Sequence, residues 1–153
     1  MTPDVESRLD AMRRTLAASP LGVVAGEVRG PWSGETCLAD GWPEYRAFLE
    51  ACDGGRFGSV DLWSASELAG KQFLGADLPG ERADWIVVGQ LLYEVLALDA
   101  RGQVVVARRD GPHESLGGLD DFLIRLLGEG YSTLVEGGEQ DEWWDVLGDA
   151  GLR

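Results

Sequence analysis

Apolar residues recur at helical spacing in four segments of the chain. Thr2 and Pro3 suit an N-cap and a first helical position, and they predict a helix over residues 3–18. Pro43 likewise begins a second predicted helix, which Asp53, Gly54 and Gly55 end. The apolar positions of the four segments, in chain order, are Val5, Leu9, Met12 and Leu16; Tyr45, Phe48, Leu49 and Cys52; Leu119, Phe122, Leu123, Leu126 and Leu127; and Trp143, Trp144 and Leu147.

Strand patterns lie between these helices. The predicted strands are Val60–Trp63, Trp85–Val88, Tyr93–Leu98 and Gln103–Arg108, and a looser strand or loop at Val23–Arg29 precedes irregular chain. Residues 99–102 connect two of them and end in Gly102, which can take the positive φ of a bulged hairpin turn. We therefore predict an α+β fold: a single domain over residues 1–153, with a central antiparallel or mixed sheet of about four to six strands and helices packed on it.

The charge balance limits the possible partners. The chain carries 27 acidic residues against 13 lysines and arginines, a formal net charge of −14. Nucleic acid and anionic membrane surfaces would be repelled, whereas a basic protein would be attracted. The first residues do not resemble a signal peptide, and no apolar run approaches 18 residues. We expect a cytoplasmic protein.

Candidate chemistry is sparse. Cys37 and Cys52 form no metal-binding motif, and the glycines of residues 54–58 follow a helix end, the reverse of a phosphate loop. His113 has Glu114 and Ser115 as sequence neighbours, an arrangement that rarely brings a catalytic relay together. We predict no catalytic residue, no metal and no cofactor. A small hydrolase that uses paired carboxylates stays as an alternative.

The tail combines aromatic residues with acids. Two adjacent tryptophans on one helix cannot both face inward, and the surrounding carboxylates are typical of the rim of an interface. The predicted partner-binding residues are Trp143, Trp144, Asp141, Glu142 and Asp145, with Glu136 and Glu139 in support; they belong to an acidic C-terminal segment, 136–153.

The segment WPEYRAFLEACDGGRFGSVDLWSASEL resembles the signature of the SUKH superfamily, which includes yeast cell-wall synthesis regulators and many bacterial immunity proteins. In that pattern a proline opens a helix with aromatic and aliphatic positions, a glycine turn ends it, and a strand follows. The matching positions are Pro43, Tyr45, Phe48, Leu49, Gly54, Gly55, Phe57 and Gly58. The resemblance extends over residues 40–127.

The resemblance implies an α+β fold and a non-enzymatic role: an immunity protein that binds and neutralises a cognate toxin. The acidic charge favours a basic, nuclease-type toxin as that partner. A regulatory scaffold of the cell-wall regulator type is the alternative, and it would bind several proteins weakly.

Overall fold

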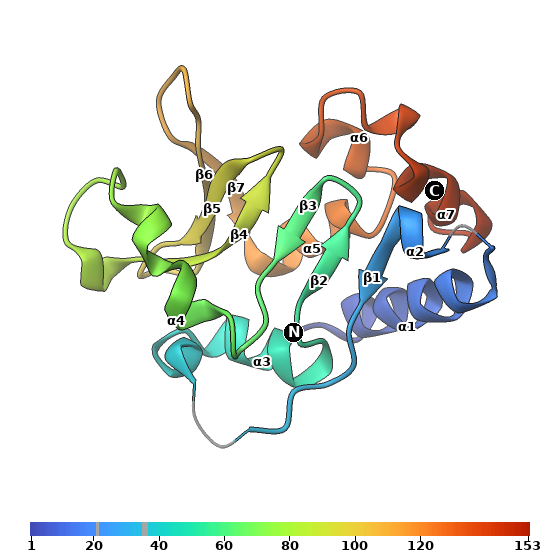
Figure 1. The fold of residues 1–153 in the computed structure, drawn as a ribbon, viewed down its shortest axis with the longest axis horizontal. Helices are drawn as coiled ribbons and strands as arrows, with labels where there is room; N and C mark the ends of the chain where they lie inside the picture. The colour runs from blue at the N-terminus through green and yellow to red at the C-terminus, as the bar shows by residue number, and fades with distance from the viewer. Residues whose placement is uncertain (21, 35–36) are drawn as a thin grey trace.

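The computed structural model describes residues 1–20, 22–34 and 37–153, and its ribbon is shown in Figure 1. Leu21 and the pair Glu35 and Thr36, which belong to the loosely assigned stretch after the first helix, lie outside the described residues. The helices are α1 (Pro3–Ala18), α2 (Gly22–Ala25), α3 (Pro43–Ala51), α4 (Leu68–Lys71), α5 (Leu119–Leu126), α6 (Tyr131–Leu134) and α7 (Glu142–Asp149). Short 3₁₀ turns occupy Leu38–Gly41, Gln72–Gly75, Arg82–Asp84 and Gly138–Gln140. None of the helices in the described ranges is long and apolar enough to cross a membrane.

The strands form one antiparallel sheet in which each strand pairs with its neighbours in sequence. They are β1 (Gly26–Val28), β2 (Gly55–Phe57), β3 (Val60–Leu62), β4 (Ile86–Leu91), β5 (Glu94–Leu98), β6 (Gln103–Ala107) and β7 (Glu114–Gly118). The α+β prediction is confirmed. The predicted strand number, four to six, is too low, because the described chain has seven strands. Strand β2 has only three residues and β7 ends in two glycines, so neither presents a hydrophobic alternation long enough to recognise in the sequence.

The two faces of the sheet differ in what covers them. Phe57, Val60 and Leu62 point to one face and join the main core, which includes Leu9 of α1, Phe122 of α5 and Trp143 of α7. In Figure 1, α5 lies behind the strands. On the other face, Leu78 packs against Val87 and Ala97 in a smaller cluster. The chain between β3 and β4, which contains α4 and Leu78, covers β4 and β5 on this face but leaves part of β2 and β3 open.

The predicted helix boundaries follow from capping. Thr2 is the N-cap of α1, where its Oγ1 accepts a hydrogen bond from the amide of Val5 at 3.4 Å. Pro43 is the first residue of α3, and Gly54 follows the helix end with φ of 74°. The helices predicted at residues 3–18, from Pro43, from Leu119 and around Trp143 are all present.

The residues that resemble the family signature form a joint between α3 and the sheet. Tyr45, Phe48 and Leu49 are fully buried. The Tyr45 hydroxyl donates to the carbonyl of Trp63 at 2.8 Å, and the carbonyl of Val88 is a second acceptor at 3.3 Å. These bonds tie α3 to β4 and to the residue that follows β3. These residues therefore hold a helix against the sheet.

Gly58, another of the signature positions, lies in the β2–β3 turn at a point of close approach to α6 and α7. It has φ of 66°, and an added Cβ would meet the Tyr131 hydroxyl and, at 2.7 Å, the Cβ of Trp143. A side chain here would therefore displace either α6 or α7.

Strand β4 departs from the predicted segment at both ends. Gly89 does not end the strand but lies inside it, at a bulge where the register with β5 shifts, and an added Cβ would collide with the carbonyl of Asp61. Trp85, the first residue of the predicted strand, precedes β4 and is half-buried. Its indole donates to the carbonyl of Pro79 at 2.6 Å. The core side of β4 is instead occupied by smaller aliphatic residues.

The two cysteines lie in different environments, and this difference predicts different reactivity. Cys52 is fully buried, and burial raises the pKa of its thiol from 9.0 to about 11. Cys37 is half-buried. At pH 8 we expect a disulfide reagent to label Cys37 at least ten-fold faster than Cys52, because only a thiolate reacts. A Cys37→Ser variant isolates the buried thiol, and labelling of both residues at one rate would contradict the assignment.

The same shift predicts a loss of stability in alkali. The pKa of Cys52 is higher in the folded chain than in the unfolded chain. Its contribution to the free energy of unfolding is therefore complete below pH 9.0 and is lost as the pH rises through about 11. A Cys52→Ala variant should lose less stability than the parent chain over that interval, as measured by urea unfolding at several pH values.

Candidate functional site

The two tryptophans of α7 have different roles. Trp143 is fully buried, stacks edge-on against Phe57 with ring centroids 5.6 Å apart, and donates its indole N–H to the carbonyl of Leu126 at 3.0 Å. It is a core residue and offers no surface to a partner. Trp144 is half-buried, with the Arg153 guanidinium 4.6 Å from its ring centroid. Of the predicted aromatic pair, only Trp144 is accessible.

Asp141 has a structural role rather than a free carboxylate. It is the N-cap of α7, where its Oδ1 accepts from the Trp143 amide at 3.0 Å. Its Oδ2 accepts from the Tyr131 hydroxyl at 2.5 Å and from Ser59 Oγ at 2.9 Å. Burial, then the Asp141 carboxylate, raises the pKa of Tyr131, so this hydroxyl stays protonated as a donor. Asp141 therefore fastens α6 and α7 to the β2–β3 turn.

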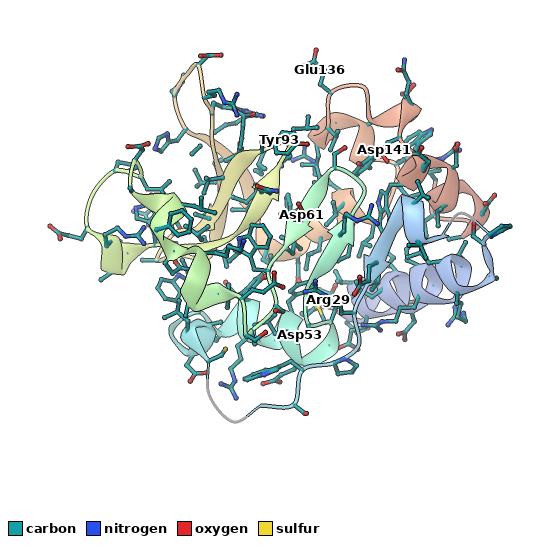
Figure 2. All side chains as sticks on the ribbon, viewed as in Figure 1. Arg29, Asp53, Asp61, Tyr93, Glu136 and Asp141 are labelled. Carbon is teal, nitrogen blue, oxygen red and sulfur yellow. The ribbon has the colours of Figure 1, made fainter. Side chains whose placement is uncertain are left out.

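The other predicted acids are exposed. Glu136, Glu139, Glu142 and Asp145 are all accessible to solvent, and Figure 2 shows Glu136 projecting from the molecule. None of the four forms an ion pair with a described residue. They can contribute negative potential to a partner's approach.

The turn between β4 and β5 is a feature that the sequence analysis missed. It consists of Leu92 and Tyr93, which have φ of 48° and 70°. Two-residue hairpin turns with two positive φ values normally contain Asn or Gly, because a Cβ atom strains this conformation and only Gly, or Asn through local hydrogen bonds of its short side chain, adopts it readily. Leu92 is nevertheless 41% exposed and Tyr93 79% exposed. The fold holds two large side chains in a strained conformation where water surrounds them.

This turn is joined to the acidic segment through Ser59. The Leu92 amide donates to the Ser59 carbonyl at 3.0 Å, and the Ser59 amide donates to the Tyr131 hydroxyl at 2.9 Å. Since Tyr131 and Ser59 also bind Asp141, the β4–β5 turn, the β2–β3 turn and the start of α7 form one connected unit. We call the exposed part of this unit, residues 58, 59, 92 and 93, the hairpin tip.

Below the hairpin tip lies the uncovered part of the sheet. Arg56, Asp61 and Gln90 are cross-strand neighbours on one face of β2, β3 and β4, and all three are half-buried. Figure 2 shows Asp61 on β3 below Tyr93. With Gly58, Ser59, Leu92 and Tyr93 these residues line a cavity of about 260 Å³, which we call the sheet-face cavity.

Polar contacts within the sheet-face cavity leave Asp61 without a cation. Gln90 donates to Asp61 Oδ2 at 2.9 Å. The guanidinium of Arg56 turns away, toward the carbonyls of Val23 and Val24, the latter at 2.9 Å. No ion pair joins Asp61 to a described residue.

Other groups considered from the sequence are spread over the molecule. His113 is exposed in the β6–β7 loop and borders a different cavity, of about 360 Å³, with Tyr93, Arg108 and Arg109. Of the paired carboxylates, Asp141 is engaged as a cap while Glu142 faces solvent. Within residues 1–20, 22–34 and 37–153, no group of three or more His, Cys, Asp or Glu side chains is placed to hold a metal ion.

Comparison with known proteins adds no assignment: no protein-family model matches the chain, and a search of curated proteins finds no significant match.

Proposed function

We propose that this chain is a non-enzymatic protein-binding domain that holds a basic protein partner against the hairpin tip. The strained turn carries the proposal. Residues in the left-handed region cost about 1–2 kcal/mol each when they are not glycine. Strain of this kind concentrates at functional sites, and here it displays a leucine and a tyrosine to solvent.

The composition of the tip suits an interface. Tyrosine is enriched among residues that anchor protein complexes, and an apolar centre with a polar rim is the usual arrangement. Two acidic features adjoin this centre: Asp61 lines the cavity below it, and the segment that contains Glu136 and Glu139 is connected to it through Tyr131 and Asp141. Because this chain has a net charge of −14, it favours a basic partner.

The proposed biological role is that of an immunity protein of the SUKH type, which neutralises a basic, nuclease-type toxin by binding it. Its support is the resemblance over residues 40–127, together with the charge. A regulatory scaffold would share the surface but would bind several proteins weakly, so the two roles differ in the number and affinity of partners.

The test begins with the protein encoded by the adjacent gene. We expect it to co-purify with this chain, to lose its toxicity or nuclease activity at a one-to-one ratio, and to associate about ten-fold more slowly at 300 mM than at 50 mM NaCl. Surface plasmon resonance gives both rate constants. An acidic adjacent product, or one that does not bind, would contradict the proposed role.

A charge variant separates steering from anchoring. Replacing Glu136, Glu139 and Glu142 with Gln and Asp145 with Asn should reduce the association rate constant several-fold and leave the dissociation rate constant nearly unchanged. The matched control replaces four exposed acids elsewhere, Glu6, Glu81, Asp84 and Asp121. Equal effects of the two variants would show that net charge alone attracts the partner.

A further inference from the structure

We propose that the sheet-face cavity binds the guanidinium of an arginine side chain, with Asp61 as its ionic partner. This inference rests on the proposed function, because it names the group of the basic partner that enters the surface below the hairpin tip. Four observations support it: the size of the cavity, a carboxylate without an ion pair to any described residue, the position of the neighbouring amide and the aromatic rim.

The size favours one side chain over a cofactor. The cavity measures about 260 Å³. Sites for small molecules and cofactors usually measure about 300–1,000 Å³. A space below that range, open at the side of a hairpin turn, suits a single long side chain inserted from a partner's surface.

The charge favours a cation. Asp61 is half-buried, and its hydrogen bond comes from the neutral amide of Gln90. The nearest cross-strand cation is Arg56, but carbonyl groups of α2 hold its guanidinium on the far side of β2. The arrangement thus keeps the internal arginine away and leaves the carboxylate available to an external one.

The acceptors favour arginine over lysine. Gln90 donates its Nε2 to Asp61 Oδ2, so its own carbonyl oxygen and Asp61 Oδ1 remain as two acceptors on adjacent strands. A guanidinium presents several N–H donors in a planar fork that can reach two such oxygens, whereas an ammonium is a point charge. Tyr93 borders the same cavity, and its ring can stack on the guanidinium plane.

A small probe tests the cavity without any partner protein. N-acetyl-arginine amide is titrated into the full-length, ¹⁵N-labelled chain, and N-acetyl-lysine amide is titrated in parallel. We expect saturable amide shifts confined to β2, β3, β4 and the Leu92–Tyr93 turn, with arginine at least five-fold tighter than lysine. Shifts scattered over the acidic surface, or equal affinity for both amides, would overturn the inference.

Substitutions assign the roles. Asp61→Asn, which keeps the size of the side chain, should weaken the arginine probe at least ten-fold, and Tyr93→Ala should weaken it about three-fold. Arg56→Gln should tighten it, because the nearest repelling charge is gone. The matched control is Glu6→Gln, at an exposed position of α1. If Glu6→Gln weakens the probe as much as Asp61→Asn does, the binding is attraction to net charge and the inference fails.

The partner experiment then distinguishes this inference from the proposed function. If the adjacent gene product binds the parent chain and binds Asp61→Asn equally well, the arginine site is wrong while the binding role stands. If the arginine probe binds as expected but the adjacent product does not, the site stands and the proposed role falls.

Discussion

Replacing Trp143 with alanine is expected to lower the free energy of unfolding by about 3–5 kcal/mol, the range measured when a buried large aromatic is truncated. The indole fills the core between α7 and β2, so its removal leaves a cavity beside Phe57. It also leaves the Leu126 carbonyl without its donor. Urea unfolding followed by far-UV circular dichroism measures the change.

Trp144→Ala is the matched control on the same helix. Its half-buried ring contacts Arg153 and its loss should lower stability by about 1 kcal/mol or less. If the first variant does not fold, Trp143→Phe keeps a ring in place and removes only the indole N–H and part of the volume. Similar losses for Trp143→Ala and Trp144→Ala would show that the two rings share the core equally, contrary to the structure.

The second large effect concerns the hairpin tip. The double variant Leu92→Asn with Tyr93→Gly should be about 1–3 kcal/mol more stable than the parent chain, because Asn-Gly is the preferred sequence for two positive φ values. The same variant should bind the adjacent gene product at least 100-fold more weakly, since both exposed anchors are absent. Thermal unfolding and surface plasmon resonance measure the two quantities.

A second tip variant separates strain from side-chain contact. Leu92→Ala with Tyr93→Ala removes the anchors but keeps a Cβ at both positions, so binding should fall without the gain in stability. An Asn-Gly chain that binds like the parent would exclude the tip as the anchor. An Asn-Gly chain without added stability would show that the turn is not strained.

The helices were accessible to sequence reasoning because their signals are local. Proline at a first helical position and an apolar stripe determine where α3 begins and which face it buries, and no distant residue is needed to recognise either. The hairpin of β5 and β6 was equally clear, since Gly102 supplies the positive φ that its connection requires. These elements are present, and each of the two strands is one residue shorter than predicted, without Tyr93 and Arg108 respectively.

The short strands were not accessible in the same way. Strand β2 has three residues and pairs with β1 and β3; its pairing with β1 joins residues far apart in the chain, such as Gly26 and Phe57. The pairing of β2 depends on the turn at Gly58 and on the packing of α7 against Phe57, and both involve tertiary contacts. Propensity alone cannot identify such a strand.

In the candidate site, too, some features could be predicted from local sequence signals and others could not. Adjacency alone established that one tryptophan of α7 faces outward, and the spacing of Trp143, Val146 and Leu147 could have identified the buried one, because these three share a face. The strained turn gave no signal at all. Leu91, Leu92 and Tyr93 have the composition of a strand interior, and only the positive φ values mark the reversal of the chain.

The order of the strands determines which loops can vary. In a sheet whose strands follow one another in sequence, successive connections alternate between its two ends. The β2–β3, β4–β5 and β6–β7 connections share the upper end in Figure 1, while α3 and α4 lie toward the lower end. Replacing or lengthening the β4–β5 and β6–β7 loops leaves the helices that secure the core untouched, whereas the β2–β3 turn is held by its contacts with α6 and α7. Changes can therefore be confined to loops at one end, much as in antibody domains, while the rest of the architecture stays as it is.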